Sequence, residues 1–128
     1  MTIKEVSEKF DLTQDTLRYY ERVGMIPTVT RNTSGIRDYQ KHDLAWVELV
    51  KCMRSAGLTV EVLVEYVKLS QEGDATIESR LNLLSEQREN LIEQKMKIDK
   101  SLERLEYKIE IYGKALETGI LVWEHKDE

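Results

Sequence analysis

The residues from 77 to 116 place the strongest constraint on how this chain can fold. Apolar side chains recur there at alternating steps of four and three, the a and d spacing of a heptad repeat, with Arg88 and Lys95 filling two gaps. The apolar positions of this seam are Ile77, Leu81, Leu84, Leu91, Ile98, Leu102, Leu105, Ile109, Tyr112 and Leu116. Such a helix is about 60 Å long, and no other segment is long enough to cover its apolar stripe. The pattern predicts a dimerisation helix that pairs with a second copy of the chain, in a parallel or an antiparallel sense.

Charge is distributed unevenly along the 128 residues, whose net charge is −5. Residues 1–54 hold 9 Lys and Arg against 8 Asp and Glu, whereas residues 55–128 hold 10 against 16. Only the first part is suited to face nucleic-acid phosphates, and there the placement of the basic residues must decide. No apolar run approaches the roughly 20 residues of a membrane span, and a single cysteine allows no internal disulfide. We expect no membrane association and a cytoplasmic location, where thiols stay reduced.

Two short helices with clear start signals open the chain. Thr2 can cap a helix over residues 3–10, and Glu5 three positions later completes a capping box. Thr13 can cap a second helix over residues 14–23. This spacing predicts a helix-turn-helix. The residues expected to pack between its helices are Ile3, Val6, Phe10, Leu12, Leu17 and Tyr20.

The segment after the second helix has the pattern of a β-hairpin. Pro27 cannot continue the helix, because proline lacks the amide hydrogen that the helix would use. Two β-prone runs, residues 28–31 and 36–39, then flank a polar turn that contains glycine. A hairpin directly after a helix-turn-helix predicts a wing, which would carry Arg31 and Arg37.

Two further helices are expected over residues 41–56 and 60–71, before the long one. Cys52 lies at the edge of the apolar arc of the first of them. Gly119 is expected to end the long helix, and the apolar cluster of residues 120–123 to fold back onto the dimer. The arc that predicts the core face of residues 41–56 consists of Ala45, Trp46, Leu49, Val50, Met53 and Ala56.

Residues 16–27, Thr-Leu-Arg-Tyr-Tyr-Glu-Arg-Val-Gly-Met-Ile-Pro, and residues 35–39, Gly-Ile-Arg-Asp-Tyr, resemble the MerR family of transcription regulators. The resemblance implies a mainly α fold. It would comprise a winged helix-turn-helix head (residues 1–72), a dimerisation helix in an antiparallel coiled coil (73–118) and a short tail (119–128).

The resemblance also implies a function. Dimers of this family bind a pseudo-palindromic operator inside a promoter, and two heads on a two-fold coiled coil would by themselves bind two half-sites. In the family, effector-bound dimers bend and untwist promoter DNA whose spacer is too long, which realigns it for RNA polymerase. Because DNA deformability depends on sequence, such a distortion is physically reasonable.

The resemblance gives a set of DNA-facing residues on the recognition helix and the wing. Arg18 and Arg37 can bind phosphate through charge-assisted hydrogen bonds, and Arg18 can also reach a guanine edge. As alternatives, Tyr20 and Tyr39 would be core aromatics and Arg22 a solvated surface charge. The full set is Thr13, Gln14, Thr16, Arg18 and Tyr19 on the helix, with Arg31, Gly35, Arg37 and Tyr39 on the wing.

Few residues are available to sense an inducer. With no cysteine beyond Cys52 and only His42 and His125, neither a thiolate metal site nor any other cofactor is expected. The run around Cys52 resembles a subgroup of the family that responds to aldehydes and other thiol-reactive electrophiles through a lone cysteine. Lys51 and Arg54 would then favour the nucleophilic thiolate. The alternative is that Cys52 packs in the core as a small hydrophobe.

Other functions stay open from the sequence. A regulator of the same fold could bind a small molecule without a covalent bond, and a coiled-coil interaction protein would have no affinity for DNA. Arg88 and Lys95 fit a role in fixing the register of the coil better than a role in lining a pocket. The sequence has no glycine-rich phosphate loop and no nucleophile paired with a base, so we do not expect an enzyme.

Overall fold

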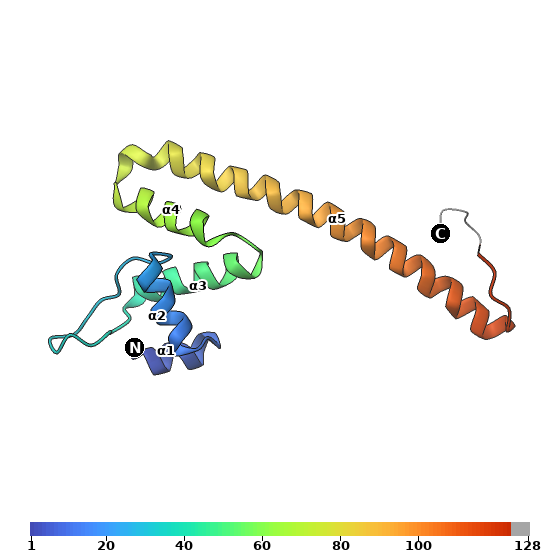
Figure 1. Ribbon diagram of the computed structural model, residues 1–128, viewed down its shortest axis with the longest axis horizontal. Helices are drawn as coiled ribbons and strands as arrows, with labels where there is room; N and C mark the ends of the chain where they lie inside the picture. The colour runs from blue at the N-terminus through green and yellow to red at the C-terminus, as the bar shows by residue number, and fades with distance from the viewer. Residues whose placement is uncertain (124–128) are drawn as a thin grey trace. The chain divides into compact units, whose positions relative to one another are not determined.

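The computed structural model describes residues 1–123, which are mainly helical (Figure 1). They belong to two compact units, Met1–Gln87 and Arg88–Glu128. None of the described helices is long and apolar enough to cross a membrane. In chain order the elements are α1 (Ile3–Phe10), α2 (Gln14–Val23), α3 (Lys41–Ser55), α4 (Val60–Gln71), the short 3₁₀ helix η1 (Asp74–Thr76) and α5 (Ile77–Thr118).

The first two helices begin at the capping residues that the sequence predicts. The Thr2 hydroxyl accepts a hydrogen bond from the amide of Glu5, whose carboxylate accepts one from the amide of Thr2, so the capping box is confirmed. Thr13 caps α2 by accepting from the amide of Thr16. Asp11 turns the chain between the helices in the left-handed conformation, with φ of 53°. The two helices pack as a helix-turn-helix, with Val6, Leu17 and Tyr20 buried.

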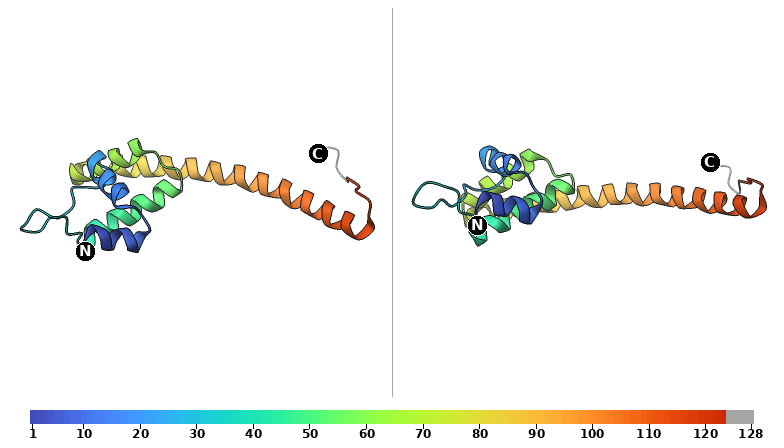
Figure 2. Two further views of the ribbon diagram at one scale, coloured as in Figure 1. Left: turned by 60° about the horizontal axis from the view of Figure 1, so that its bottom comes forward. Right: turned by 90° about the horizontal axis from the view of Figure 1, so that it is seen from below.

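The loop of residues 27–39 protrudes from the first unit in both views of Figure 2. It contains one antiparallel bridge, between Arg31 and Arg37, in place of the two strands that the sequence predicts. Next to the bridge, the amide of Asp38 donates to the carbonyl oxygen of Thr30 at 2.7 Å. An isolated hairpin is only marginally stable in water. The shape of this loop therefore depends on contacts with the helices.

The buried face of α3 differs from the predicted one. Its buried residues are Asp43, Val47 and Val50, and only Val50 belongs to the predicted arc. The prediction was wrong because a wheel of apolar residues omits Asp43, whose carboxylate is buried on backbone amides of Gln40 (2.8 Å) and Thr30 (3.4 Å). Partly or fully exposed instead are Ala45, Trp46, Leu49, Met53 and Ala56.

Helices α3 and α4 contact each other through aromatic side chains. The ring of Trp46 on α3 lies 5.7 Å from that of Tyr66 on α4, measured between centroids. Thr59 caps α4, which has the predicted bounds and buries Leu63 and Val67. Helix α3 ends at Ser55, one residue earlier than expected.

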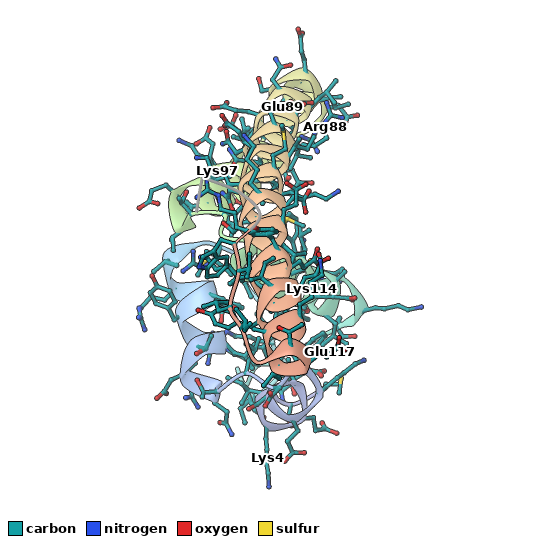
Figure 3. The ribbon with its side chains drawn as sticks, turned by 90° about the vertical axis from the view of Figure 1, so that its right-hand side faces the viewer. Lys4, Arg88, Glu89, Lys97, Lys114 and Glu117 are labelled. Atoms are coloured by element: carbon teal, nitrogen blue, oxygen red, sulfur yellow. The ribbon has the colours of Figure 1, made fainter. Side chains whose placement is uncertain are left out.

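Helix α5 is continuous over 42 residues and ends before Gly119, as predicted. Charged side chains are spread along it, from Arg88 and Glu89 to Lys114 and Glu117 (Figure 3). In the single chain nine of the ten seam positions are exposed, by fractions from 44% at Leu84 to 88% at Leu116, and Leu91 is half-buried. Most of the apolar stripe that the sequence predicts is therefore without cover in one chain.

The second unit contains an aromatic cluster at the end of α5. Trp123 of the tail packs against Tyr107 and Tyr112, with ring centroids 6.4 and 5.6 Å apart, and the ammonium of Lys108 lies 4.5 Å from the Trp123 ring. The tail thus folds back onto α5 of its own chain. The rest of the predicted tail, including His125, lies outside the described residues.

Candidate nucleic-acid interface

The N-terminal end of α2 carries the first predicted DNA contacts. The hydroxyl of Thr13 donates to the hydroxyl of Thr16 at 2.8 Å and accepts from the amide of Thr16 at 3.0 Å. This cap leaves the positive end of a ten-residue helix facing outward, with Gln14 partly exposed beside it. A phosphate oxygen is a suitable ligand for such a helix end.

Arg18 folds back along α2 toward the helix start. Its guanidinium donates to the carboxylate of Asp15 at 3.0 Å and to the amide oxygen of Gln14 at 3.3 Å. Asp15 is 96% exposed and Arg18 is 43% exposed. Exposed ion pairs of this kind contribute about 0–1 kcal/mol, so a stronger anion can take the place of Asp15. Arg18 therefore stays available for a nucleic acid.

The two tyrosines in the middle of α2 differ in exposure. Tyr20 is 6% exposed and is therefore a core aromatic, which was the alternative given for it from the sequence. Tyr19 is 37% exposed. The guanidinium of Arg22 lies 5.3 Å from the Tyr19 ring centroid, which is a cation–π distance. Arg22 is a surface residue, as its alternative interpretation holds, but it also restrains the ring of Tyr19.

The arginines of the 27–39 loop converge on one carboxylate of α2. The Nε atom of Arg37 donates to Glu21 at 2.6 Å, and a terminal nitrogen of Arg31 lies 3.7 Å from the other Glu21 oxygen. Arg31 also donates to the carbonyl oxygen of Gly35 at 3.1 Å. Side-chain exposure is 9% for Glu21, 24% for Arg37 and 41% for Arg31. The structure therefore brings the predicted wing arginines against the recognition helix.

Glu21 is a residue of this site that the sequence analysis missed. The same carboxylate accepts from the backbone amide of Val29 at 2.9 Å, so it holds the loop by main chain and side chain together. A signal was present in the sequence. Glu21 lies one helical turn after Leu17, on the face that packs inward, where an acidic residue needs donors.

The turn at the tip of the loop is closed by a side chain. The Oδ1 atom of Asn32 accepts from the amides of Ser34 and Ile36 at 2.9 and 3.0 Å. Gly35 has φ of +79°, which disfavours any side chain, although a β-carbon there would meet no atom within 4 Å. Within this chain, Gly35 is needed for its backbone conformation.

Tyr39 does not lie on the surface that its predicted role requires. It is 1% exposed, and its hydroxyl has no hydrogen-bond partner among the described residues. Burial raises the pKa of this phenol above its ordinary value, so it is neutral at neutral pH. A ring in the core cannot reach a phosphate, and the core alternative holds for Tyr39 as it does for Tyr20.

Cys52 is exposed on α3, which contradicts the alternative that it packs in the core of the single chain. The two cations next to it have other partners. The ammonium of Lys51 donates to the carbonyl oxygen of Phe10, and the guanidinium of Arg54 donates to that of Leu58 at 2.7 Å. Within the described residues no group of three or more His, Cys, Asp and Glu side chains is placed to hold a metal ion.

Comparison with known proteins identifies the fold. The family model described as MerR HTH family regulatory protein matches residues 1–69. This chain belongs to the MerR family. Its members are transcriptional regulators, which are not enzymes.

Two curated HTH-type relatives show how far the similarity reaches. The transcriptional regulator AdhR of Bacillus subtilis is 56% identical over 93 residues, which is 73% of this chain but only 66% of AdhR. An uncharacterized HTH-type regulator of Haemophilus influenzae is 33% identical over 118 residues, 92% of this chain and 87% of that protein. The similarity thus includes most of α5.

Solved MerR structures share this fold over nearly the whole chain. A MerR family regulator of Listeria monocytogenes has a TM-score of 0.89 and 42% identity, covering 93% of this chain and 90% of its own. HiNmlR, a MerR family regulator lacking the sensor domain, was crystallised bound to promoter DNA. Its TM-score is 0.83 and its sequence identity is 32%, and the match covers 94% of this chain and 95% of HiNmlR.

The burial of Tyr39 gives a first prediction. In the Tyr39→Phe variant we expect the free energy of unfolding to rise by about 1 kcal/mol, because a buried hydroxyl without a partner is removed. Urea denaturation measures this change. DNA affinity, measured by fluorescence anisotropy, should stay within about twofold of wild type. A large loss of affinity with unchanged stability would return Tyr39 to the DNA contacts.

Proposed function

We propose that this chain acts as a homodimeric MerR regulator whose α2 and 27–39 loop bind promoter DNA through Arg18, Arg31 and Arg37. The observation that carries the proposal is the convergence of the loop arginines on Glu21 of α2, which makes one polar surface from two segments. The solved relative bound to promoter DNA supports it. The other proposed contacts are Thr13, Gln14, Thr16, Tyr19 and Gly35.

In this proposal the head (residues 1–72) binds one half-site and the helix of residues 73–118 joins two heads. Exposed seam residues support a second copy as the partner of α5, since burying them removes apolar area from water. One stretch of the seam, with Leu105, Ile109, Tyr112 and Leu116, lines a groove of about 640 Å³. We adopt the antiparallel arrangement because the family resemblance implies it.

The proposed mechanism follows from the two heads. A dimer with two-fold symmetry places its recognition helices on two half-sites of a pseudo-palindrome. Contacts with both half-sites can offset the energy needed to bend and untwist the DNA between them. We propose that this distortion realigns a promoter for RNA polymerase and activates transcription.

The loop contact is tested by Arg37→Ala. Because each phosphate contact releases counterions, the slope of log affinity against log salt should become less steep by about two for a dimer, one contact in each protomer. Specific affinity should fall about tenfold. Fluorescence anisotropy at several salt concentrations measures both, with Lys100→Ala on α5 as the control. An unchanged slope would show that the loop makes no phosphate contact through Arg37. A wild-type protein whose DNA affinity does not depend on salt would favour the alternative of a coiled-coil interaction protein.

An acidic residue introduced into the apolar seam of α5 tests the proposed dimer. Leu102 is 50% exposed in one chain, so Leu102→Asp would barely affect a monomer but would bury an unpaired carboxylate in a paired seam. We expect sedimentation equilibrium to show a dimer for wild type and a monomer for Leu102→Asp, whose operator affinity falls at least about tenfold. Lys100→Asp, two residues away and outside the seam, should stay dimeric. A dimeric Leu102→Asp variant would contradict the proposed seam.

We further propose that Cys52 senses aldehydes or related electrophiles. The exposure of the thiol on α3 favours this role, because a reagent can reach it. The sulfur of the thiolate would add to the carbonyl carbon, the carbonyl π bond would open, and the oxygen would take up a proton to give a hemithioacetal. A small molecule bound without a covalent bond is the alternative inducer.

Transcription in vitro from the promoter beside its own gene tests the sensor. Aldehyde should activate wild type, whereas Cys52→Ser should bind the same DNA but lose the response, because its hydroxyl is a far weaker nucleophile than a thiolate. Mass spectrometry of the reacted protein reports the adduct. An equal response in both proteins would assign the inducer to a non-covalent site.

A further inference from the structure

A carboxylate in the proposed DNA surface requires an explanation. Glu21 lies on the recognition helix, where its negative charge repels phosphates, and its side chain is only 9% exposed. Burying a charge is unfavourable unless donors surround it. Its hydrogen-bond donors are the amide of Val29 and the Nε atom of Arg37, and the guanidinium of Arg31 forms an ion pair with it at 3.7 Å. Every one of them belongs to the loop that we propose to contact DNA.

We propose that Glu21 is a positioning residue that sets the specificity of DNA binding without touching the DNA. This inference rests on the proposed DNA interface. Glu21 fixes the 27–39 loop to α2, so that the contacts made by the loop and those made by the helix keep one spacing. A DNA duplex then binds tightly only if its phosphates and base edges lie at that spacing.

The geometry of Arg37 supports this role. Its Nε atom is bound by Glu21 at 2.6 Å, and its two terminal nitrogens have no hydrogen bond to any described residue. The Arg37 side chain is 24% exposed, and these two nitrogens are the donors left for another partner. A planar fork held at Nε presents them in a fixed direction, as bidentate binding of a phosphate requires.

The main-chain anchor adds a second restraint. The amide of Val29 donates to the Oε2 atom of Glu21, while Arg37 donates to Oε1. Both ends of the loop, which carry these two residues, are thus tied to one side chain. The single bridge between Arg31 and Arg37 joins the same two ends to each other. Loss of the carboxylate charge would leave that bridge and the Val29 bond but remove the partner of the Arg37 Nε atom and the ion pair of Arg31.

Opposite effects on two kinds of DNA make the proposal testable. Glu21→Gln removes a negative charge and frees two arginines, so affinity for non-specific DNA should rise, since that affinity is electrostatic. The amide oxygen of glutamine can still accept from Val29, which keeps the loop attached. Affinity for a specific duplex should fall because Arg37 is no longer held. A purely structural role for Glu21 would instead lower both affinities together.

The experiment uses the full chain and two duplexes, one selected from a random pool by the wild-type protein and one with the same bases scrambled. The ratio of their affinities should fall at least about fivefold in Glu21→Gln, because phosphate contacts fix the register in which the helix reads the bases. The matched control is Glu48→Gln, which removes one negative charge from an exposed side chain of α3 that has no hydrogen bond or ion pair with the described residues of the loop. Its ratio should stay at the wild-type value. An unchanged ratio in Glu21→Gln would overturn the proposal.

A double-mutant cycle separates this proposal from the proposed interface. If Glu21 acts through Arg37, Glu21→Gln should change the ratio much less in an Arg37→Ala background than in wild type. Equal changes in both backgrounds would contradict the positioning role. If Arg37→Ala alone leaves specific affinity unchanged, the interface fails, and with it the basis of this inference. If Arg37→Ala weakens binding and Glu21→Gln leaves the ratio unchanged, only the positioning role fails.

Discussion

Two buried carboxylates hold the segment on which DNA recognition is proposed to depend. The 27–39 loop has one backbone bridge and cannot keep its shape as an isolated hairpin in water. Glu21 of α2 holds it through Val29 and the arginines, and Asp43 of α3 holds it through the amide of Thr30. Each acid is buried because it has donors there, and removing its partners would leave an uncompensated charge. The loop is therefore attached to two helices, α2 and α3, at both of its ends and at Thr30.

This arrangement also explains how an acidic protein can present a basic surface. The net charge of −5 is carried by the sequence after residue 54, and the head itself is nearly neutral. Placement decides the local potential. Glu21 is withdrawn to 9% exposure while the arginines paired with it reach further into solvent, and exposed Asp15 is only loosely paired with Arg18. The outer layer of the surface is consequently richer in positive charge than its composition suggests.

Local signals predicted more of this structure than patterns of hydrophobicity did. Thr2, Thr13 and Thr59 cap helices where the sequence places them, because a cap depends on neighbours within three residues. The predicted buried face of α3 was wrong, because Asp43, which a pattern of apolar residues leaves out, is buried through a hydrogen bond with Thr30, thirteen residues away. The pairing of Glu21 with Arg37 spans sixteen residues and the burial of Tyr39 needs the whole core, so neither follows from local spacing. The exposed seam, in contrast, was predictable because a period of seven residues needs no tertiary information.

The two faces of α3 suggest how a modified Cys52 could affect DNA binding. One face is buried through Asp43, Val47 and Val50, while Cys52 is exposed on the same helix. Asp43 reaches the 27–39 loop by its hydrogen bond with Thr30, so α3 is a rigid element that carries both the thiol and an anchor of the loop. An adduct can shift the equilibrium only if it interacts differently with two positions of this helix. A displacement of α3 that breaks the Asp43 bond would leave the loop held by Glu21 alone and would release its backbone at Thr30, without any new contact with DNA.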